Sequence, residues 1–263
     1  YRLYGEDDYL QRAAFGAPEI QRVGLAGVIL QMKALGLGKI EAFPFLDAPS
    51  KRAIDEGYRV LEELGALDDA GEPNDVGRKL SRLPLDPRLG RMVLAGDKEK
   101  CLKEVLVLAS ALSVQDPRER PLSAQKQADE CHRKFRDEAS DFVGMLKLWD
   151  WYQDTRNRCS KNQIRKQCRD NFVSFVRMKE WSDIHGQLLE RCREMDHRPN
   201  EAAAKGDAIH RAVLAGLLGR IGMWQQEKRS YAGARQIRFV LHPSSALAKK
   251  PPQWVFAAEI VET

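Results

Sequence analysis

The spacing of apolar residues changes once along this chain, and that change constrains the fold more than any other feature. As far as about residue 222, apolar residues recur at the three- and four-residue intervals of amphipathic helices. Beyond it, QIRFVLH (236–242) and QWVFAAEIV (253–261) are strand-like, and a proline-rich turn separates them. The sequence therefore predicts a mainly α-helical chain that ends in a small β-structure.

Residues 17–84 show the order helix, helix, hairpin, helix. Pro18 suits the first turn of one helix, a second begins near Pro49, and Gly71 with Pro73 marks a tight turn before a helical piece at about 76–83. This order is typical of a winged helix. The second helix, SKRAIDEGYRVLEEL, carries three basic and four acidic residues, whereas a helix that enters a DNA groove should be net basic. We therefore interpret this unit as a structural wedge rather than a reader of duplex DNA.

The next part, residues 85–200, is predicted to be almost entirely helical. Pro87 starts one helix, which we expect to end at Gly96 and Asp97. The periodicity predicts further helices at about residues 98–112, 123–135, 139–152, 161–181 and 182–195. HRPNEAAAKGD (197–207) has the composition of a hinge, and AIHRAVLAGLLGRIG (208–222) predicts one more helix before the strands begin.

Positive charge is concentrated in the second and third parts of the chain, although the net charge is only +5. Residues 1–80 carry 10 basic and 14 acidic groups, residues 81–200 carry 24 and 19, and residues 201–263 carry 9 and 5. This distribution is expected if the later parts face a phosphate backbone.

The densest basic cluster lies between Arg156 and Lys179, where eight basic residues accompany a single acidic one, Asp170. On a helix, four residues of this segment share an apolar stripe: Ile164, Cys168, Phe172 and Phe175. Four polar donors lie along its flank: Asn162, Arg165, Lys166 and Arg169. Guanidinium forks suit phosphate oxygens, so nucleic-acid contact is one interpretation. The other is a solvated helix face, or arginines that bond to neighbouring helix ends.

Two further basic groups are candidates for the same role. In QDPRERP (115–121), Arg118 and Arg120 lie on a proline-stiffened loop, which could clamp a strand or form an internal ion-pair hub that ties this helical part to the winged helix. Near the C-terminal strands lie five more candidates: Arg235, Arg238, His242, Lys249 and Lys250. Phe239 and Trp254 could add an aromatic platform for single strands there, or could belong to the core.

The sequence contains no complete catalytic constellation. The glycine-rich phosphate loop GxxxxGK[ST] and the DEAH tetrapeptide are both missing, and no G-x-S-x-G or H-E-x-x-H motif occurs. The five cysteines show no C-x-x-C spacing, which argues against a zinc site or a disulfide framework and favours reduced thiols in the cytoplasm. No apolar run is long enough to span a membrane. We predict no catalytic, cofactor-binding or metal-binding residue in this chain.

Three segments together resemble a known family: LPLDPRLGRM (83–92), KEKCLKEVLVLASAL (98–112) and SVQDPRERP (113–121). They resemble the region behind the ATPase core of DEAH-box RNA helicases, most closely the bacterial HrpA type, and YRLYGEDDYL at the start fits the same family. The resemblance extends through the chain to AAEIVET. A chain that opens on a tyrosine is also expected to be a piece of a longer protein.

The resemblance implies four modules. They are the tail of the second RecA-like lobe (1–16, a short strand and turn), a winged helix (17–84), a helical ratchet domain (85–200) and the start of an OB-fold, expected to be truncated (201–263). It implies that the parent protein uses ATP and Mg to move 3′ to 5′ along single-stranded RNA, and that this region guides and grips the strand. Implied partners are single-stranded RNA or DNA, the helicase's own RecA-like lobes and an activating protein at the OB-fold.

The resemblance also selects among the basic residues. Those expected to contact RNA are Arg118, Arg120, Lys161, Asn162, Arg165, Lys166, Arg169, Arg238, His242, Lys249 and Lys250. The alternative function is a non-enzymatic scaffold that binds protein partners through the acidic N-terminal third.

Overall fold

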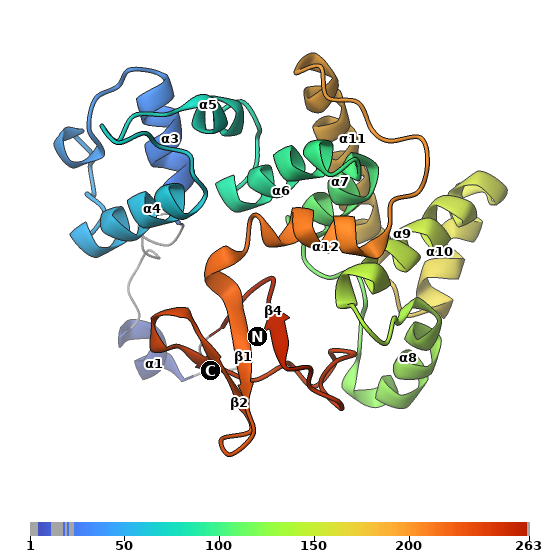
Figure 1. Ribbon diagram of the computed structural model, residues 1–263. Helices are drawn as coiled ribbons and strands as arrows, with labels where there is room; N and C mark the ends of the chain where they lie inside the picture. Colours follow the sequence, from blue (N-terminus) through green and yellow to red (C-terminus); the bar gives the residue numbers. More distant parts are fainter. Residues whose placement is uncertain (1–4, 12–17, 19, 21–23, 262–263) are drawn as a thin grey trace. The chain divides into compact units, whose positions relative to one another are not determined.

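The computed structural model describes residues 5–11, 18, 20 and 24–261, and the chain divides into two compact units, Tyr1–Ser81 and Arg82–Thr263 (Figure 1). The first unit contains helices α1 (Glu6–Gln11), α3 (Ala26–Ala34), α4 (Lys51–Glu63) and α5 (Asp75–Leu80), with a 3₁₀ turn at Ile40–Ala42. The strand and turn expected for residues 1–16 are wrong at Glu6–Gln11, which is helical. The rest of that segment lies outside the described residues.

Local capping explains why the helices of the first unit begin and end where they do. The Ser50 hydroxyl accepts a hydrogen bond from the Ala53 N–H at 3.2 Å and starts α4, and Gly65, at φ +63°, follows its end. The Asn74 side chain caps α5. Leu67 and Pro73 pair across the expected hairpin. The helix, helix, hairpin, helix order of the winged-helix prediction is therefore present between α3 and α5.

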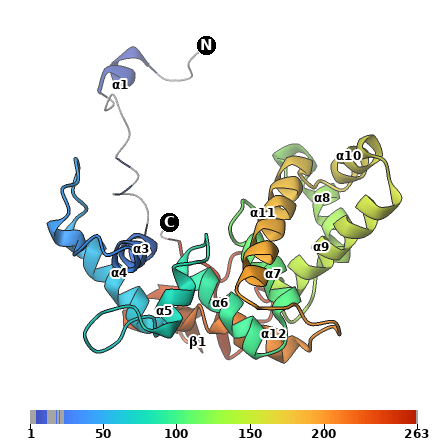
Figure 2. The same cartoon turned by 90° about the horizontal axis from the view of Figure 1, so that it is seen from above.

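The second unit is a helical bundle built around α7 (Leu102–Ala111), most of which is buried. Four helices pack against α7: α6 (Pro87–Lys98), α9 (Asp141–Arg158), α11 (Phe175–Glu194) and α12 (Gly206–Leu214). Helix α8 (Gln125–His132), flanked by 3₁₀ turns at Leu122–Ala124 and Arg133–Phe135, and helix α10 (Lys161–Asp170) complete the bundle. Figure 2 shows α10 beside α9 and α11.

Helix α6 does not end at Gly96 and Asp97 as predicted but continues to Lys98. Gly96 faces the next helix: a Cβ atom there would lie 2.9 Å from the Cβ of Val105 on α7. The glycine therefore allows the two helices to approach closely, and the chain reverses afterwards at Lys100, where φ is +57°.

The break between the last two long helices also differs from the prediction of helices at 161–181 and 182–195. Helix α10 stops at Asp170, and α11 runs without interruption from Phe175 to Glu194. Phe172 has a φ of +53°, so it cannot continue the predicted stripe. Its carbonyl accepts the N–H of Glu119 at 2.8 Å, and the N–H of Ser174 donates to the carbonyl of Pro117 at 2.7 Å. A distant loop therefore fixes this break.

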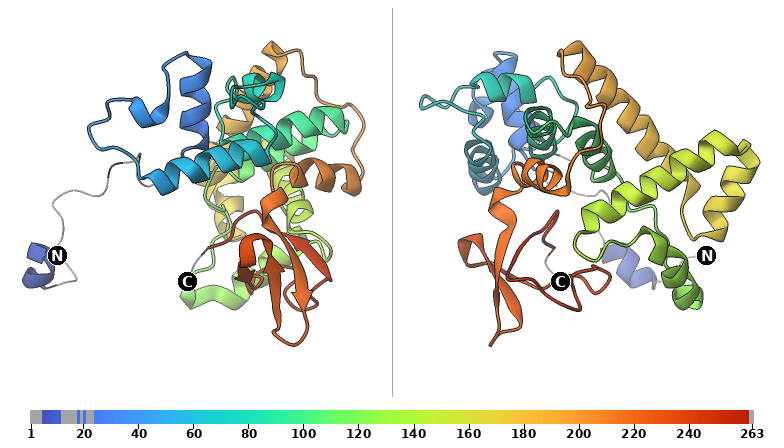
Figure 3. Two further views of the ribbon diagram at one scale, coloured as in Figure 1. Left: turned by 60° about the vertical axis from the view of Figure 1, so that its left-hand side comes forward. Right: turned by 45° about the vertical axis from the view of Figure 1, so that its right-hand side comes forward.

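The C-terminal part of the second unit forms an antiparallel sheet in the order β3-β2-β1-β4 (Figure 3). Its strands are β1 (Ile221–Gln225), β2 (Ser230–Gly233), β3 (Arg238–Phe239) and β4 (Trp254–Phe256). The predicted helix at 208–222 was too long, because α12 ends at Leu214 and a 3₁₀ turn, Leu218–Arg220, leads into β1. The prediction of a mainly helical chain with a small C-terminal β-structure is confirmed.

Candidate nucleic-acid interface

Helix α10 buries Ile164 and Cys168 and turns its polar side chains outward. A capping box starts it: the Ser160 side chain caps the first turn, and the Ser160 N–H donates to Gln163 Oε1 at 2.8 Å. All five predicted donors on the helix are exposed: Lys161, Asn162, Arg165, Lys166 and Arg169. The last four fall within a sector of about 100° of the helix surface. The structure therefore brings these four residues together on one face.

Carboxylates do not neutralise this face. Within the described part of the chain, the side chains of Lys161, Asn162 and Lys166 have no hydrogen-bond or ion-pair partner. Arg169 lies 3.8 Å from the carboxylate of Asp170, in an exposed pair of little strength. The guanidinium of Arg165 lies 5.3 Å from the ring centre of Phe175 rather than on an acid. The positive charge of α10 is therefore available to a partner.

The turn that ends α10 is held by the end of α8 and by the 3₁₀ turn that follows it. His132 Nε2 donates to the carbonyl of Phe172 at 2.9 Å, and Lys134 Nζ bonds to Asn171 Oδ1 at 2.5 Å. Burial lowers the pKa of His132, and the nearby Arg118 guanidinium acts in the same direction, although the bond to Phe172 opposes them. These contacts fix the position of the α10 face relative to the bundle.

Arg118 and Arg120, by contrast, are both ion-paired. Arg118 Nη2 lies 2.6 Å from Asp116 Oδ2, and Arg120 forms two bonds of 2.7 Å to the carboxylate of Asp129. Burial alone would raise the pKa of Asp116, but its hydrogen bonds with Arg118 lower it. Both acidic partners lie in the second unit, so these pairs do not test a hub that ties this part of the chain to the winged helix, and RNA contact by these two arginines stays a prediction as well.

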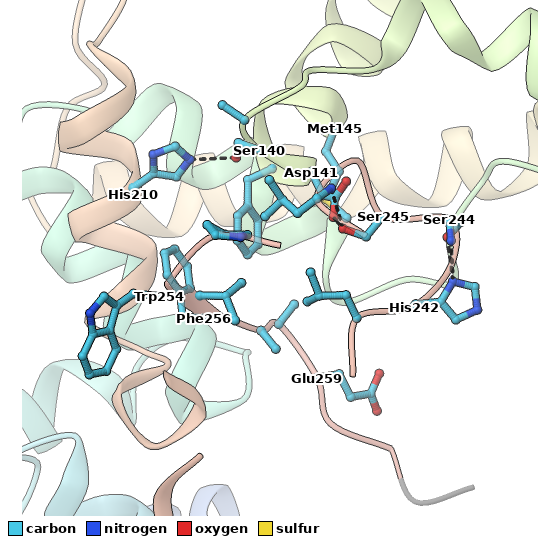
Figure 4. Close-up of a pocket in the computed structure, with 18 of the residues that line it drawn as sticks. Ser140, Asp141, Met145, His210, His242, Ser244, Ser245, Trp254, Phe256 and Glu259 are labelled. Carbon is cyan, nitrogen blue, oxygen red and sulfur yellow. Dashed lines mark hydrogen bonds between the residues drawn. The ribbon is translucent and has the colours of Figure 1, made fainter. Parts of the chain in front are cut away.

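A cavity of about 630 Å³ lies beside the N-terminus of α9, where the loop after β3 meets the bundle (Figure 4). The carboxylate of Asp141 anchors that loop, because it accepts the Ser245 hydroxyl at 2.6 Å and the Ala246 N–H at 2.9 Å. Ser140 Oγ lies 2.7 Å from Nε2 of His210. The cavity brings together residues from five segments of the second unit that are far apart in the sequence.

The predicted residues of the C-terminal part do not gather at one point. His242 lines this cavity together with Arg118, and its Nδ1 accepts the Ser244 N–H at 3.2 Å. Arg238 instead lines a second, smaller hollow at the sheet, while Lys249 and Lys250 are exposed on the following loop. Trp254 is 58% exposed, which contradicts its interpretation as a core residue.

Sequence reasoning missed the residues that shape these two spaces. In the sequence, Ser140 and Asp141 indicate no more than the start of a helix. Lys228 lies in the hairpin between β1 and β2, two strands that the sequence did not predict. Within the described ranges, no cluster of His, Cys, Asp and Glu residues could hold a metal ion. A search of the same ranges finds no helix able to cross a membrane.

Comparison with known proteins places the chain. Residues 86–171 match the helicase associated domain (HA2), ratchet-like, and residues 209–263 match an oligonucleotide/oligosaccharide-binding (OB) fold. The whole chain aligns with the ATP-dependent RNA helicase HrpA of Escherichia coli (strain K12) at 49% identity, and the aligned segment is 20% of that protein. The chain is similar to the C-terminal region of DEAH-box RNA helicases of the HrpA type.

Two further relatives agree with this placement. The whole chain aligns with the HrpA homolog of Haemophilus influenzae at 48% identity, over 21% of that protein. It also aligns with the pre-mRNA-splicing factor ATP-dependent RNA helicase prp22 of Schizosaccharomyces pombe at 28% identity, over 22% of that protein. The chain thus spans about a fifth of the length of the curated relatives it matches. It corresponds to their C-terminal accessory region, as the sequence resemblance implied.

Proposed function

We propose that this chain guides and grips single-stranded RNA as the accessory region of an ATP-dependent helicase. The open basic face of α10 carries the proposal, since four hydrogen-bond donors share one sector of the helix and only Arg169 lies near a carboxylate, in an exposed pair. Contacts of this kind read phosphates rather than bases, so the grip should tolerate any sequence and weaken steeply with salt.

Charge reversal on α10 tests the proposal. The 263-residue chain should bind a short fluorescent single-stranded RNA weakly in an anisotropy titration, and Arg165→Glu with Arg169→Glu should weaken that binding about tenfold or more. A matched control reverses Lys103 and Arg193, which are also exposed. Arg193, like Arg169, lies in the last turn of its helix. An equal loss in the control, or no loss on α10, would contradict the proposal.

The remaining parts of the mechanism belong to the whole protein. In our proposal residues 1–16 end the second RecA-like lobe, 17–84 form the winged helix, 85–200 the ratchet and 201–263 the OB-fold. The motor lobes would bind ATP and Mg, pack against this region and drive movement 3′ to 5′ along the strand. An activating protein would dock at the OB-fold, and the protein would act in the cytoplasm, in keeping with its five free cysteines.

A protein-binding scaffold remains the second candidate, because the first unit exposes an apolar loop after α3. Leu35 is 72% exposed and Leu46 fully exposed, and Phe43 packs against Phe45 at 4.8 Å in the same loop. Pull-down with and without nuclease separates the two candidates. Partners that survive nuclease treatment and are lost on Leu35→Ser with Leu46→Ser would favour the scaffold.

A further inference from the structure

A thiol and an amine meet between the end of α8 and the end of α10. Cys131 lies in the last turn of α8, and Lys134 lies in the 3₁₀ turn that follows it. Residues three apart in helical backbone project from the same side. Cys131 Sγ lies 3.8 Å from the carbonyl oxygen of Asp170, and Lys134 Nζ donates to Asn171 Oδ1 at 2.5 Å. Both side chains therefore reach the same turn, where α8 and α10 lie side by side (Figure 1).

Cys131 is one of the two cysteines of this chain that are not buried. The other three are buried, and burial raises the pKa of each thiol to about 11, so they are rarely thiolates: Cys101, Cys168 and Cys192. The second half-buried thiol, Cys159, lies at the C-cap of α9 and has no lysine three or four residues away. Cys131 is therefore the accessible thiol with a lysine beside it on the same helical surface.

Lys134 is exposed, but its amine is partly shielded from water. Nζ lies 4.9 Å from the ring centres of Phe135 and Trp151, and within the described part of the chain no carboxylate forms an ion pair with it. Although aromatic rings attract a cation, burial lowers the pKa of Lys134, and the nearby Cys131 opposes this only in part. The amine is therefore neutral, with a free lone pair, more often than that of an ordinary surface lysine.

We propose that Cys131 and Lys134 form an acylation site, which takes an acyl group from a small thioester and holds it as an amide on Lys134. In the first step the Cys131 thiolate attacks the thioester carbonyl, a new C–S bond forms, and the thiolate of the donor leaves. In the second step the neutral Lys134 amine attacks the new thioester carbonyl. The C–N bond forms, the bond to Cys131 Sγ breaks, and the departing thiolate takes up the proton that the amine releases. The Cys131 thiol is regenerated, and nothing is oxidised or reduced.

Acylation would change one of the contacts that hold the turn after α10. The amide nitrogen is uncharged and keeps one N–H, whereas the ammonium has three. It would lose the attraction of the Phe135 and Trp151 rings and the charge-assisted part of the bond to Asn171. The reaction itself needs no RNA, so the site can be tested independently of the proposed function.

The test follows acetylation of the 263-residue chain by acetyl-coenzyme A, with peptide mass spectrometry at each lysine. Lys126 is the reference, because it is exposed on the same helix and has no cysteine three or four residues away. Lys134 should be acetylated about fivefold faster than Lys126, or more. Cys131→Ser should lower the rate at Lys134 about fivefold and leave Lys126 unchanged. Cys159→Ser, which removes the other half-buried thiol, should change neither rate.

A second reagent separates the thiol relay from an effect of the substitution on the fold. N-acetoxysuccinimide acylates amines directly, so with it Cys131→Ser should keep the rate at Lys134 within about twofold of the parent. An equal loss with both reagents would show that Cys131 acts through the fold and would overturn the inference. Equal rates at Lys134 and Lys126 with acetyl-coenzyme A, or an unchanged rate at Lys134 in Cys131→Ser, would overturn it as well.

Discussion

The indole nitrogen of Trp181 forms hydrogen bonds inside the bundle, so its removal should lower the stability of the second unit. Trp181 is 1% exposed, and its Nε1–H lies 3.0 Å from both the carbonyl of Val107 and the hydroxyl of Ser110. The Ser110 hydroxyl is itself buried and donates within α7, at 2.7 Å to the carbonyl of Leu106. Trp181→Phe would leave the Ser110 hydroxyl oxygen without the indole donor, which should lower the free energy of unfolding by about 1–3 kcal/mol. It would also open a small void, at roughly 1 kcal/mol. We expect a total loss of about 2–4 kcal/mol.

Trp149→Phe is the matched control for this prediction. Trp149 is 8% exposed and packs on Trp181 at 5.1 Å, but within the described residues its indole N–H has no partner. Urea denaturation followed by circular dichroism should show Trp181→Phe to be the more destabilising change. Adding Ser110→Ala should recover part of the loss, since both partners are then gone. Equal losses for the two tryptophans, or strict additivity with Ser110→Ala, would refute the reasoning.

Three further predictions follow from the described contacts. Gly77→Ala should destabilise the first unit by about 1–3 kcal/mol in thermal unfolding, because its Cβ would lie 2.2 Å from the Ala66 carbonyl oxygen. Burial lowers the pKa of His132 in the folded state, so its contribution to stability is complete above the unfolded value of about 6.5 and is lost as pH falls below it. Asp141→Asn should speed amide exchange at Ala246 about tenfold, because it weakens a charge-assisted anchor.

Each of these has a control. Gly186→Ala should be neutral or stabilising, since no atom lies within 4 Å of a Cβ there. His132→Gln keeps an N–H donor without a titrating ring, so its urea midpoint should fall less between about pH 7.5 and 5.5 than that of the parent. An identical fall would assign the pH dependence elsewhere. Unchanged exchange at Ala246 in Asp141→Asn would show that the carboxylate does not hold the loop.

Features set by neighbouring residues could be predicted from the sequence. Pro87 begins α6, and Gly65 follows the C-cap residue Leu64 at the end of α4, both as expected, because a proline or a glycine acts within one turn. The basic face of α10 was predictable for the same reason, since helical periodicity alone places Arg165 and Arg169 away from Ile164.

Features set by distant residues could not be predicted. The end of α10 depends on Phe172 bonding to Glu119, more than fifty residues earlier in the chain. Gly96 suggested a helix end, although its role is to admit Val105 of the next helix. Strands β1 and β2 are short and do not alternate clearly, so only their pairing with each other and with β3 and β4 identifies them.

The cavity beside α9 depends on the longest of these separations, from Asp141 to Ser245. The periodicity of apolar residues does not predict contacts between residues so far apart in the sequence. The pairing of Arg118 with Asp116 is local, yet the sequence left it open, because a loop arginine can bond equally well to a phosphate or to its own neighbour.

The salt dependence of RNA binding tests the central claim most directly. A plot of log K against log salt should be a straight line with a negative slope for the parent chain. Arg165→Gln with Arg169→Gln should make that slope less negative by about 1.4, the share of two phosphate contacts on a single strand. Lys103→Gln with Arg193→Gln should leave the slope of the parent. A slope that is the same in all three proteins would contradict an electrostatic grip by α10.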